Sequence, residues 1–258
     1  MVTAHLFWAY GSLSRLEILS INSFIYHGFK VILWSYDKIP NTPHGCELRD
    51  AREILSEDLV FLNQKGSYAG FSDLFRYAVL NQKGGLYADT DVVCLKNANE
   101  LPHHPFLVTE ESGTRKKIIN QLRKLFGFAK PNRINGNVIF NPNPKKGNLI
   151  DLAFQYSLNF PKTEVKWSEI GPSLLSAIIK IYPTHGFKIM SPEFANPISQ
   201  HDCPKLLLSN KKLPKEAYFL HCYNEKWRRS NVDKNMPYPI GSILDKLDAI
   251  FNINQMDK

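Results

Sequence analysis

Hydrophobic and polar positions in the first 36 residues predict a strand, a helix and a second strand. Residues 4–10 form a short apolar run. Apolar residues then recur at helical spacing over residues 18–25, after a Ser-x-x-Glu capping box that begins at Ser14 and before a glycine at Gly28. Residues 30–36 read as a buried strand. Two strands joined by a helix favour a parallel crossover connection.

A second helix is predicted over residues 71–82, with Ser72 as its N-terminal cap and Asp73 near its positive end. Gly84 and Gly85 end this helix, and a strand begins at Leu86. The chain stays extended through residues 92–95. This region therefore continues the strand and helix alternation of the first 36 residues.

Weaker patterns follow in the second half of the chain. They predict strands at 138–140 and 217–222, a helix from Gly171 to Ile181, an irregular segment at 192–204 and a terminal helix at 243–251. Residues 135–137 precede a strand and read as a plain turn, with a segment that faces a bound acceptor molecule as the alternative. Alternating strands and helices without a linker predict one α/β domain over residues 1–258.

Composition supports a folded protein, because 43% of the 258 residues are hydrophobic. No apolar run approaches the roughly 20 residues that cross a bilayer, and no secretory leader is apparent, so we expect an intracellular chain. The four cysteines are widely spaced, which argues against a zinc site or a disulfide framework. Cys94 and Cys222 lie in apolar runs and are expected to be buried thiols.

The net charge is +8, with basic stretches at residues 115–133 and 211–234. Such stretches are most often solvated surface. They could also attract anionic lipid headgroups or a pyrophosphate-linked substrate, or bind nucleic acid. Aromatic residues are not interleaved with these charges, so nucleic acid ranks last and is not expected as a partner.

The strongest candidate chemistry is the triplet Asp89-Thr90-Asp91. Two carboxylates at i and i+2 of an extended chain point to the same side, and with phosphate oxygens they suit Mg²⁺ or Mn²⁺. The triplet also follows a predicted strand, at whose carboxyl end open α/β sheets bind ligands. An Asp-x-Asp is common in surface turns, however, so the triplet alone does not identify a metal site.

The preceding helix adds Asp73 and Arg76, which fall on one helix face together with Tyr77 and Leu80. One interpretation is a surface ion pair worth a few tenths of a kcal/mol. The other is a pair that binds sugar hydroxyls, with the carboxylate accepting and the guanidinium donating.

Residues 71–77 (FSDLFRY) and 84–91 (GGLYADTD) together resemble the signature of glycosyltransferase family 32. Residues 6–17, 23–37, 171–172 and 221–227 are similar to other blocks of that family, most weakly towards the two ends of the chain. The resemblance implies a GT-A type fold, a Rossmann-like single domain with a mixed central sheet. Residues 1–100 would form its nucleotide-sugar half, and residues 101–258 its acceptor side and closing segment.

The same resemblance implies a retaining glycosyltransferase with a nucleotide-diphosphate donor, a UDP-sugar, and a divalent metal, Mn²⁺ or Mg²⁺. Its catalytic residues would be Asp73, Arg76 and Asp91, and its metal ligands Asp89, Asp91 and His221. Nucleotide-sugar contacts would come from Trp8, Ser72, Asp73, Arg76, Tyr87, Asp89, Asn224 and Trp227. Trp8 and His221 could instead be ordinary packed side chains, and the spacing of the last block departs from that of the related toxins.

The expected setting is bacterial surface-polysaccharide synthesis on a glycan or lipid-linked oligosaccharide acceptor. The enzyme would be cytoplasmic, with peripheral association at the inner face of the plasma membrane. A toxin-like transferase with a protein acceptor, a metal-dependent phosphohydrolase or nucleotidyltransferase, and a non-catalytic binding module remain as alternatives.

Overall fold

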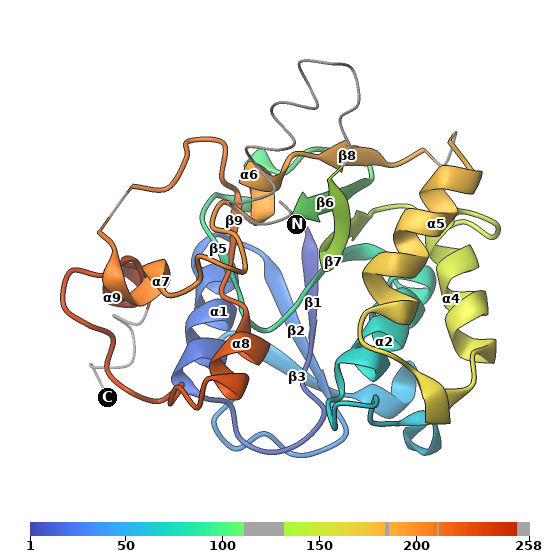
Figure 1. Ribbon diagram of the computed structural model, residues 1–258, viewed down its shortest axis with the longest axis horizontal. Helices are drawn as coiled ribbons and strands as arrows, with labels where there is room; N and C mark the ends of the chain where they lie inside the picture. The colour runs from blue at the N-terminus through green and yellow to red at the C-terminus, as the bar shows by residue number, and fades with distance from the viewer. Residues whose placement is uncertain (111–131, 184–185, 211, 252–258) are drawn as a thin grey trace.

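The computed structural model describes residues 1–110, 132–183, 186–210 and 212–251, which form helices around a central sheet (Figure 1). The sheet has seven strands in the order β3-β2-β1-β4-β7-β6-β8. Their bounds are β1 Thr3–Phe7, β2 Lys30–Ser35, β3 Cys46–Asp50, β4 Gly85–Ala88, β6 Phe106–Glu110, β7 Arg133–Asn141 and β8 Lys188–Met190. Neighbouring strands are parallel except where β7 pairs with β4 and β6. The predicted α/β class with a mixed central sheet is confirmed.

Helices cover both faces of this sheet (Figure 1). The helices α2 (Ala69–Gln82), α4 (Leu149–Asn159) and α5 (Leu174–Ile181) pack on one face, where Phe75 and Phe7 stack at 4.2 Å between ring centroids. The helix α1 (Arg15–Tyr26) packs on the other face, around Phe24 and Leu33. The apolar side chains of both faces are almost fully buried. Burial of each large apolar side chain contributes roughly 2 kcal/mol to stability, and this burial holds the helices against the sheet.

The first helix forms as its sequence predicts. The capping box of Ser14 and Glu17 is present, and α1 ends at Tyr26, with Gly28 in the left-handed region at φ +81°. The serine hydroxyls of α1 also hold the short strand β5 (Val92–Cys94): Ser20 Oγ donates to the Val92 carbonyl at 2.6 Å. The helix thereby fixes the strand that follows the acidic triplet.

The start of α2 differs from the prediction. The helix begins at Ala69, with Tyr68 as its cap, and Ser72 donates its backbone N–H to the Tyr68 carbonyl at 2.8 Å. The Ser72 hydroxyl lies 2.9 Å from the Tyr87 hydroxyl, so it serves a tertiary contact and does not cap the helix. At the other end, a Cβ at Gly85 would lie 2.8 Å from the Thr3 carbonyl, so glycine is required where β4 meets β1.

The second half departs more from the sequence pattern. Residues 135–137 lie inside the long strand β7 and do not form a turn, because both edges of β7 are paired in the sheet. The strands β3 and β6 and the helix α4 were not predicted. The predicted strand at 217–222 is the shorter β9 (Phe219–His221), which pairs with β5, and Asn224–Arg229 forms the unpredicted helix α8.

The helix predicted from Gly171 to Ile181 is a regular α-helix only over α5, because the backbone of Gly171 is non-helical at φ −102° and ψ −117°. The segment 192–204, predicted as irregular, begins with the short helix α6 (Pro192–Ala195) and is followed by α7 (Lys205–Leu208). The helix α9 spans Ile243–Phe251 as predicted. Most of the basic stretch 115–133 lies outside the described residues, as does Lys211. Cys94 and Cys222 are buried, and none of the four cysteines is paired. In the described part of the chain, no helix is long and apolar enough to span a membrane.

Candidate functional site

The acidic triplet occupies a tight turn at the carboxyl end of β4. Asp89 donates its N–H to the Asn137 carbonyl at 2.9 Å, and Val92 N–H closes the turn on the Asp89 carbonyl at 3.0 Å. The extended geometry predicted for this triplet is therefore wrong. The turn still places both carboxylates at the edge where parallel strands β1 and β4 end, which is the location that the sequence predicts.

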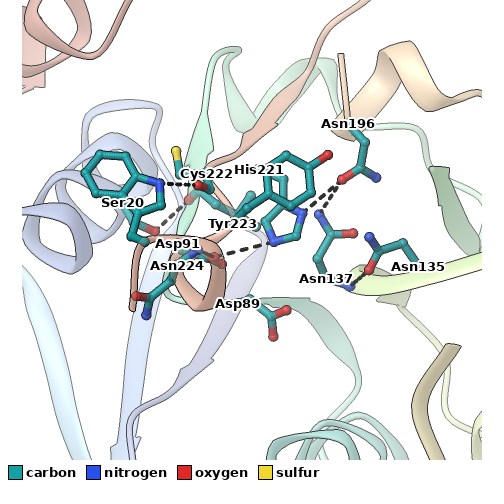
Figure 2. Close-up of polar contacts among 12 residues, drawn as sticks. Ser20, Asp89, Asp91, Asn135, Asn137, Asn196, His221, Cys222, Tyr223 and Asn224 are labelled. Carbon is teal, nitrogen blue, oxygen red and sulfur yellow. Dashed lines mark hydrogen bonds and ion pairs between the residues drawn. The ribbon is translucent and has the colours of Figure 1, made fainter. Parts of the chain in front are cut away.

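Pairing of β5 with β9 brings a histidine to the two carboxylates. The register sets Val92 opposite His221, and Cys222 N–H donates to the Asp91 carbonyl at 2.8 Å. One ligand atom from each of Asp89, Asp91 and His221 lies within 4.8 Å of the others. Figure 2 shows the His221 ring between Asp91 and Asn196. The structure thus brings together side chains that are far apart in the sequence, since 132 positions separate Asp89 from His221 (221 − 89).

Asp91 is held by its neighbours as a carboxylate. Its Oδ2 accepts the Asn224 N–H at 2.6 Å and lies 3.4 Å from His221 Nε2. The Asn224 amide reaches it because Tyr223 adopts a left-handed backbone at φ +58°. Burial would raise the pKa of Asp91, but His221 and the Asn224 amide outweigh it and lower that pKa. Burial lowers the pKa of His221 because it disfavours the charged ring. The Asp91 carboxylate has the opposite effect, and the net result is that the pKa of the imidazole lies above its ordinary value.

Arg76 joins the helix α2 to the acidic turn. Its Nη1 lies 3.1 Å from Asp73 Oδ1, and its Nη2 lies 2.8 Å from Asp89 Oδ1. Both Asp73 and Arg76 are buried, so the interpretation as an exposed surface ion pair is excluded. Burial raises the pKa of Asp89 to about 6, with Arg76 opposing and Asp91 adding to the rise. Burial also raises the pKa of Asp73, against the charge of Arg76.

Two glycines make room for this ion pair. A Cβ at Gly136 on β7 would lie 2.1 Å from Arg76 Nη1, and a Cβ at Gly171 would lie 2.3 Å from Asp73 Oδ2. Both distances are far below van der Waals contact. The two charged side chains can therefore occupy their positions only because both neighbouring segments carry glycine there.

A cavity of about 560 Å³ opens beside these residues. Its walls carry eight of the residues that the sequence singled out for donor or metal binding: Trp8, Ser72, Asp73, Arg76, Asp89, Asp91, His221 and Asn224. Trp8 follows β1, donates its indole N–H to the Gly11 carbonyl at 3.0 Å and carries Lys234 Nζ at 5.1 Å from its ring centroid. It is partly exposed and lines the cavity.

Three expected contacts are not where the sequence suggested. Tyr87 is fully buried beneath Arg76, 5.0 Å from ring centroid to guanidinium carbon, and does not line the cavity. Trp227 is buried in a separate apolar cluster with its indole N–H on the Cys222 carbonyl at 2.8 Å, so it does not cover a diphosphate. Asn224 lines the cavity, but its side-chain amide donates to Glu17 Oε1 at 3.1 Å.

Other polar residues of the site were missed. Asn137 and Asn196 are buried beside His221, and Glu17 is fully buried behind Asn224. The sequence did single out Asn135-Gly136-Asn137, but as a turn; two asparagines beside an apolar strand were the available signal for a buried role, because buried amides need specific partners. Asn196 had no signal, since it lies in a segment without periodicity.

Comparison with known proteins supports the central motif. Residues 16–107 match the family model described as "Glycosyltransferase sugar-binding region containing DXD motif". The match spans α1 to β6 and includes Asp73, Arg76, Asp89 and Asp91. The segment that matches is thus the segment that carries the acidic turn and the helix before it.

Two curated relatives and one solved structure are also similar to this chain. Inositol phosphoceramide mannosyltransferase 3 of Schizosaccharomyces pombe (strain 972 / ATCC 24843) is 34% identical over 133 residues, 49% of this chain and 33% of the relative. Uncharacterized glycosyltransferase L373 of Acanthamoeba polyphaga mimivirus is 35% identical over 82 residues, 30% of this chain and 28% of the relative. The chain thus covers about a third of the length of these relatives. The apo-form glycosyltransferase GlyE of Streptococcus pneumoniae TIGR4 aligns with 98% of this chain and 60% of its own, at 16% identity and a TM-score of 0.47.

The family match agrees with the motif that the sequence alone singled out, and the two curated relatives carry glycosyltransferase names. Residues 16–107 of this chain are therefore similar to a glycosyltransferase sugar-binding region that contains a DXD motif.

Proposed function

We propose that this chain is a retaining GT-A glycosyltransferase that transfers a sugar from a nucleotide-diphosphate donor, a UDP-sugar, to a glycan or lipid acceptor. One observation carries the proposal: the Asp89, Asp91 and His221 cluster and the buried Asp73–Arg76 pair line a single cavity. Residues 1–258 would act as one domain, because the site takes side chains from both the 1–100 half and the 101–258 half.

The donor atoms of the cluster fit a divalent cation. Two carboxylates suit Mg²⁺ or Mn²⁺, and the imidazole nitrogen favours the transition metal Mn²⁺. Asp89, Asp91 and His221 would hold the ion. A bound cation supplies positive charge next to the donor phosphates, which offsets the charge that develops on the leaving nucleotide.

The remaining residues would bind and orient the donor. Asp73 and Arg76 are fixed against each other and present a carboxylate and a guanidinium to sugar hydroxyls. Trp8 at the end of β1 would stack on the base, and Ser72 would contribute its hydroxyl from the same cavity wall. In this proposal Tyr87 supports Arg76 from beneath, Asn224 acts through its backbone N–H, and Trp227 has no contact with the donor.

The proposed chemistry is front-face attack. The acceptor oxygen forms a bond to C1 on the side from which the phosphate oxygen leaves, and the acceptor proton passes to that phosphate oxygen. The carboxylates that line the cavity are already engaged: Asp73 and Asp89 by Arg76, Asp91 by the Asn224 N–H and His221, Glu110 by Asn135 Nδ2 at 2.9 Å, and Glu225 by Arg228 and Arg229. This engagement favours direct transfer over a covalent intermediate, and a trapped sugar–enzyme adduct would refute it.

A lipid acceptor at an anionic membrane surface is supported by a second observation. Leu208 on α7 and Ile240 before α9 are 81% and 99% exposed, and the Ile243 N–H to Ser209 carbonyl bond of 3.0 Å makes their segments neighbours. Exposed lysines accompany them at positions 205, 212, 215 and 246. Apolar side chains among lysines suit an anionic headgroup region. One relative is named for an inositol phosphoceramide, which accords with such an acceptor.

For the biological setting, we propose that the enzyme takes part in the synthesis of a surface glycan or glycolipid. The curated relatives come from a fungus and a virus, so the expected role in bacterial polysaccharide synthesis is one version of it. A protein acceptor is the alternative within the same reaction class.

A donor panel with product analysis tests the function. Purified protein is incubated with Mn²⁺ and UDP- or GDP-linked hexoses, with and without lipid and glycan acceptors. Release of nucleoside diphosphate with free or transferred sugar is expected for at least one donor. Release of nucleoside monophosphate and sugar phosphate would instead identify a phosphohydrolase.

A further inference from the structure

Trp167 lies at the edge of the cavity, where three segments of the chain meet. Arg229 at the end of α8 places its guanidinium carbon 4.6 Å from the centroid of the Trp167 ring. Lys65, in the loop before α2, places its Nζ 5.2 Å from the same ring. Two positive charges from distant parts of the sequence therefore converge on one aromatic side chain.

The backbone at this edge is fixed by hydrogen bonds. Asn63 is buried, and its Oδ1 accepts the Lys65 N–H at 2.9 Å. The Gln64 N–H donates to the Val165 carbonyl at 3.2 Å, which ties this loop to the segment just before Trp167. The relative positions of Lys65 and Trp167 are therefore set by the fold.

Positive charge exceeds negative charge around this ring. Glu225 is shared by two arginines, since its Oε1 accepts from Arg229 Nε and from Arg228 Nη2, both at 2.7 Å. Within the described ranges, neither Lys65 nor Lys226, which lines the cavity, forms an ion pair. One carboxylate thus serves these four cations, and a cleft edge with an excess of one charge attracts ions of the opposite sign.

The polar groups without a protein partner at this edge are hydrogen-bond donors. The other three tryptophans, Trp8, Trp34 and Trp227, donate their indole N–H to protein acceptors. In the part of the chain that the structure describes, the Trp167 indole N–H has no such acceptor, and Arg229 uses only its Nε. Indole, guanidinium and ammonium groups donate and do not accept. A phosphate group, which offers several charged acceptor oxygens, complements this set.

The edge borders the proposed sugar position and not the proposed cation position. The first residue of α8 binds the Asp91 carboxylate through its N–H, whereas Arg229 is five residues later, roughly 7.5 Å further along the helix axis. Gly171, four residues after Trp167, packs directly against Asp73. A phosphate at Trp167 would therefore belong to the molecule that approaches the sugar, not to the diphosphate of the donor.

We propose that Trp167, Arg229, Lys65 and Lys226 form a subsite for a phosphate group that the acceptor carries. The assignment to the acceptor rests on the proposed function, whereas anion binding at Trp167 does not. The indole N–H donates to a phosphate oxygen, and the three cations neutralise its charge. Because charge-assisted hydrogen bonds are among the stronger ones, a phosphate ester is expected to bind roughly tenfold tighter, or more, than its uncharged parent.

The indole N–H signal of Trp167 is the direct readout. The ¹⁵N–¹H spectrum carries four indole signals, one for each tryptophan, and that of Trp167 is assigned by its absence in Trp167→Phe. Glucose 6-phosphate and glycerol 3-phosphate are titrated in parallel with glucose and glycerol at constant ionic strength, first without and then with UDP and Mg²⁺.

Both phosphate esters are expected to shift the Trp167 signal, the uncharged parents are not, and UDP should leave the shift in place. Tighter binding of glucose 6-phosphate would indicate a phosphorylated glycan, and tighter binding of glycerol 3-phosphate a phospholipid headgroup. The proposal is overturned by the absence of a shift, by equal shifts from esters and parents, or by displacement of the esters by UDP.

Variants test the contribution of the cations. Arg229→Met keeps an apolar stem on the ring and removes the charge, so it is expected to weaken binding of both esters roughly tenfold. Arg52→Met is the matched control, because Arg52 also lies over an aromatic ring (Tyr36, 5.6 Å) and pairs with a carboxylate, but does not line the cavity. Unchanged affinity in a folded Arg229→Met, or equal losses in the two variants, would contradict the proposal.

The subsite and the proposed function can fail separately. If the esters bind at Trp167 and no donor is turned over, the assignment to an acceptor fails with the transferase, whereas the anion subsite stands. If a donor is turned over and the esters do not bind, the subsite fails and the transferase stands.

Discussion

Arg76 is the residue on which the geometry of the site depends most. It contacts Asp73 and Asp89, and it can do so only because Gly136 presents no side chain. A buried charge without its partners is unfavourable, so displacement of this guanidinium should lower the stability of the protein and weaken donor binding.

Gly136→Ala tests this directly. The added methyl would overlap Arg76 Nη1, so we expect a loss of about 1–3 kcal/mol in the free energy of unfolding and at least a tenfold lower kcat/KM. In an Arg76→Ala background the same substitution should cost less than about 0.5 kcal/mol, because the clash is gone. Urea unfolding of the four proteins in this cycle measures the coupling, and equal losses in both backgrounds would exclude the clash.

His5 makes stability depend on pH. It is buried on β1 and accepts the Trp34 indole N–H at 3.1 Å, and burial lowers its pKa to about 4. An unfolded chain takes up this proton near pH 6.5, whereas the folded chain does so only near pH 4. Stability from this group is therefore present above pH 6.5 and is lost as the pH falls toward 4, by about 3 kcal/mol in full.

His5→Gln keeps an acceptor for Trp34 and removes the titration. Urea unfolding at pH 7.5 and pH 5 should show wild type losing about 2 kcal/mol more than the variant between these values. An equal loss of unfolding free energy in the two proteins between pH 7.5 and pH 5 would show that His5 does not titrate in this way.

Among the elements, the closing segment that includes β9 and α8 is tied to α1 by one carboxylate. Glu17 is fully buried, accepts the Ser14 N–H at 2.8 Å in the capping box, and binds Asn224 Nδ2 and Lys234 Nζ at 3.1 and 2.7 Å. The same side chain therefore caps a helix and anchors the segment whose backbone holds Asp91.

Glu17→Ala is expected to cost about 3 kcal/mol of unfolding free energy, since a helix cap and a buried ion pair are lost together. Glu53→Ala, which removes a surface pair with Arg49, should cost less than about 0.5 kcal/mol. Chemical denaturation compares the two variants. A Glu17→Ala loss as small as that of Glu53→Ala would mean that the segment is anchored elsewhere.

The elements that sequence could predict are those with strong local signals. The helix α1, the strand β2 and the terminal helix α9 have a capping box, an unbroken apolar run or clear periodicity, and all three form as predicted. The strand β3 was missed because it lies at the sheet edge and alternates polar residues (CELRD). Its pairing with β2 depends on tertiary contacts, which no local sequence pattern reveals.

In the candidate site, too, the residues with a local sequence pattern could be predicted, and those brought in by tertiary contacts could not. Asp73, Arg76, Asp89 and Asp91 lie within 19 residues (73–91), and their pattern was visible in the sequence. The environment of His221 was not, because it depends on the pairing of β5 with β9 and on Asn196 from an irregular segment. Trp227 was misassigned because its position in the chain is close to the site, whereas its indole packs into the core.

At the scale of the whole molecule, α7 and α9 lie at one end, beyond α1 and away from α4 and α5 (Figure 1). If this end meets an anionic membrane, the protein should float with phosphatidylglycerol vesicles, but not with phosphatidylcholine vesicles, and release with salt. The double variant Leu208→Asp, Ile240→Asp should lose this binding at unchanged stability. Equal flotation with both vesicle types, or undiminished binding of the variant, would contradict a membrane-facing role.

The central claim is that the acidic turn holds the cation on which sugar transfer depends. Asp91→Asn keeps an oxygen for the Asn224 N–H and removes the charge, so it separates the metal role from the structural one. The direct measurement is the rate of sugar release or transfer from the best donor, with and without Mn²⁺, in wild type and variant. We predict that wild type requires the cation and that folded Asp91→Asn is at least 100-fold slower at saturating Mn²⁺. A metal-independent wild type, or a variant of unchanged rate, would contradict the account.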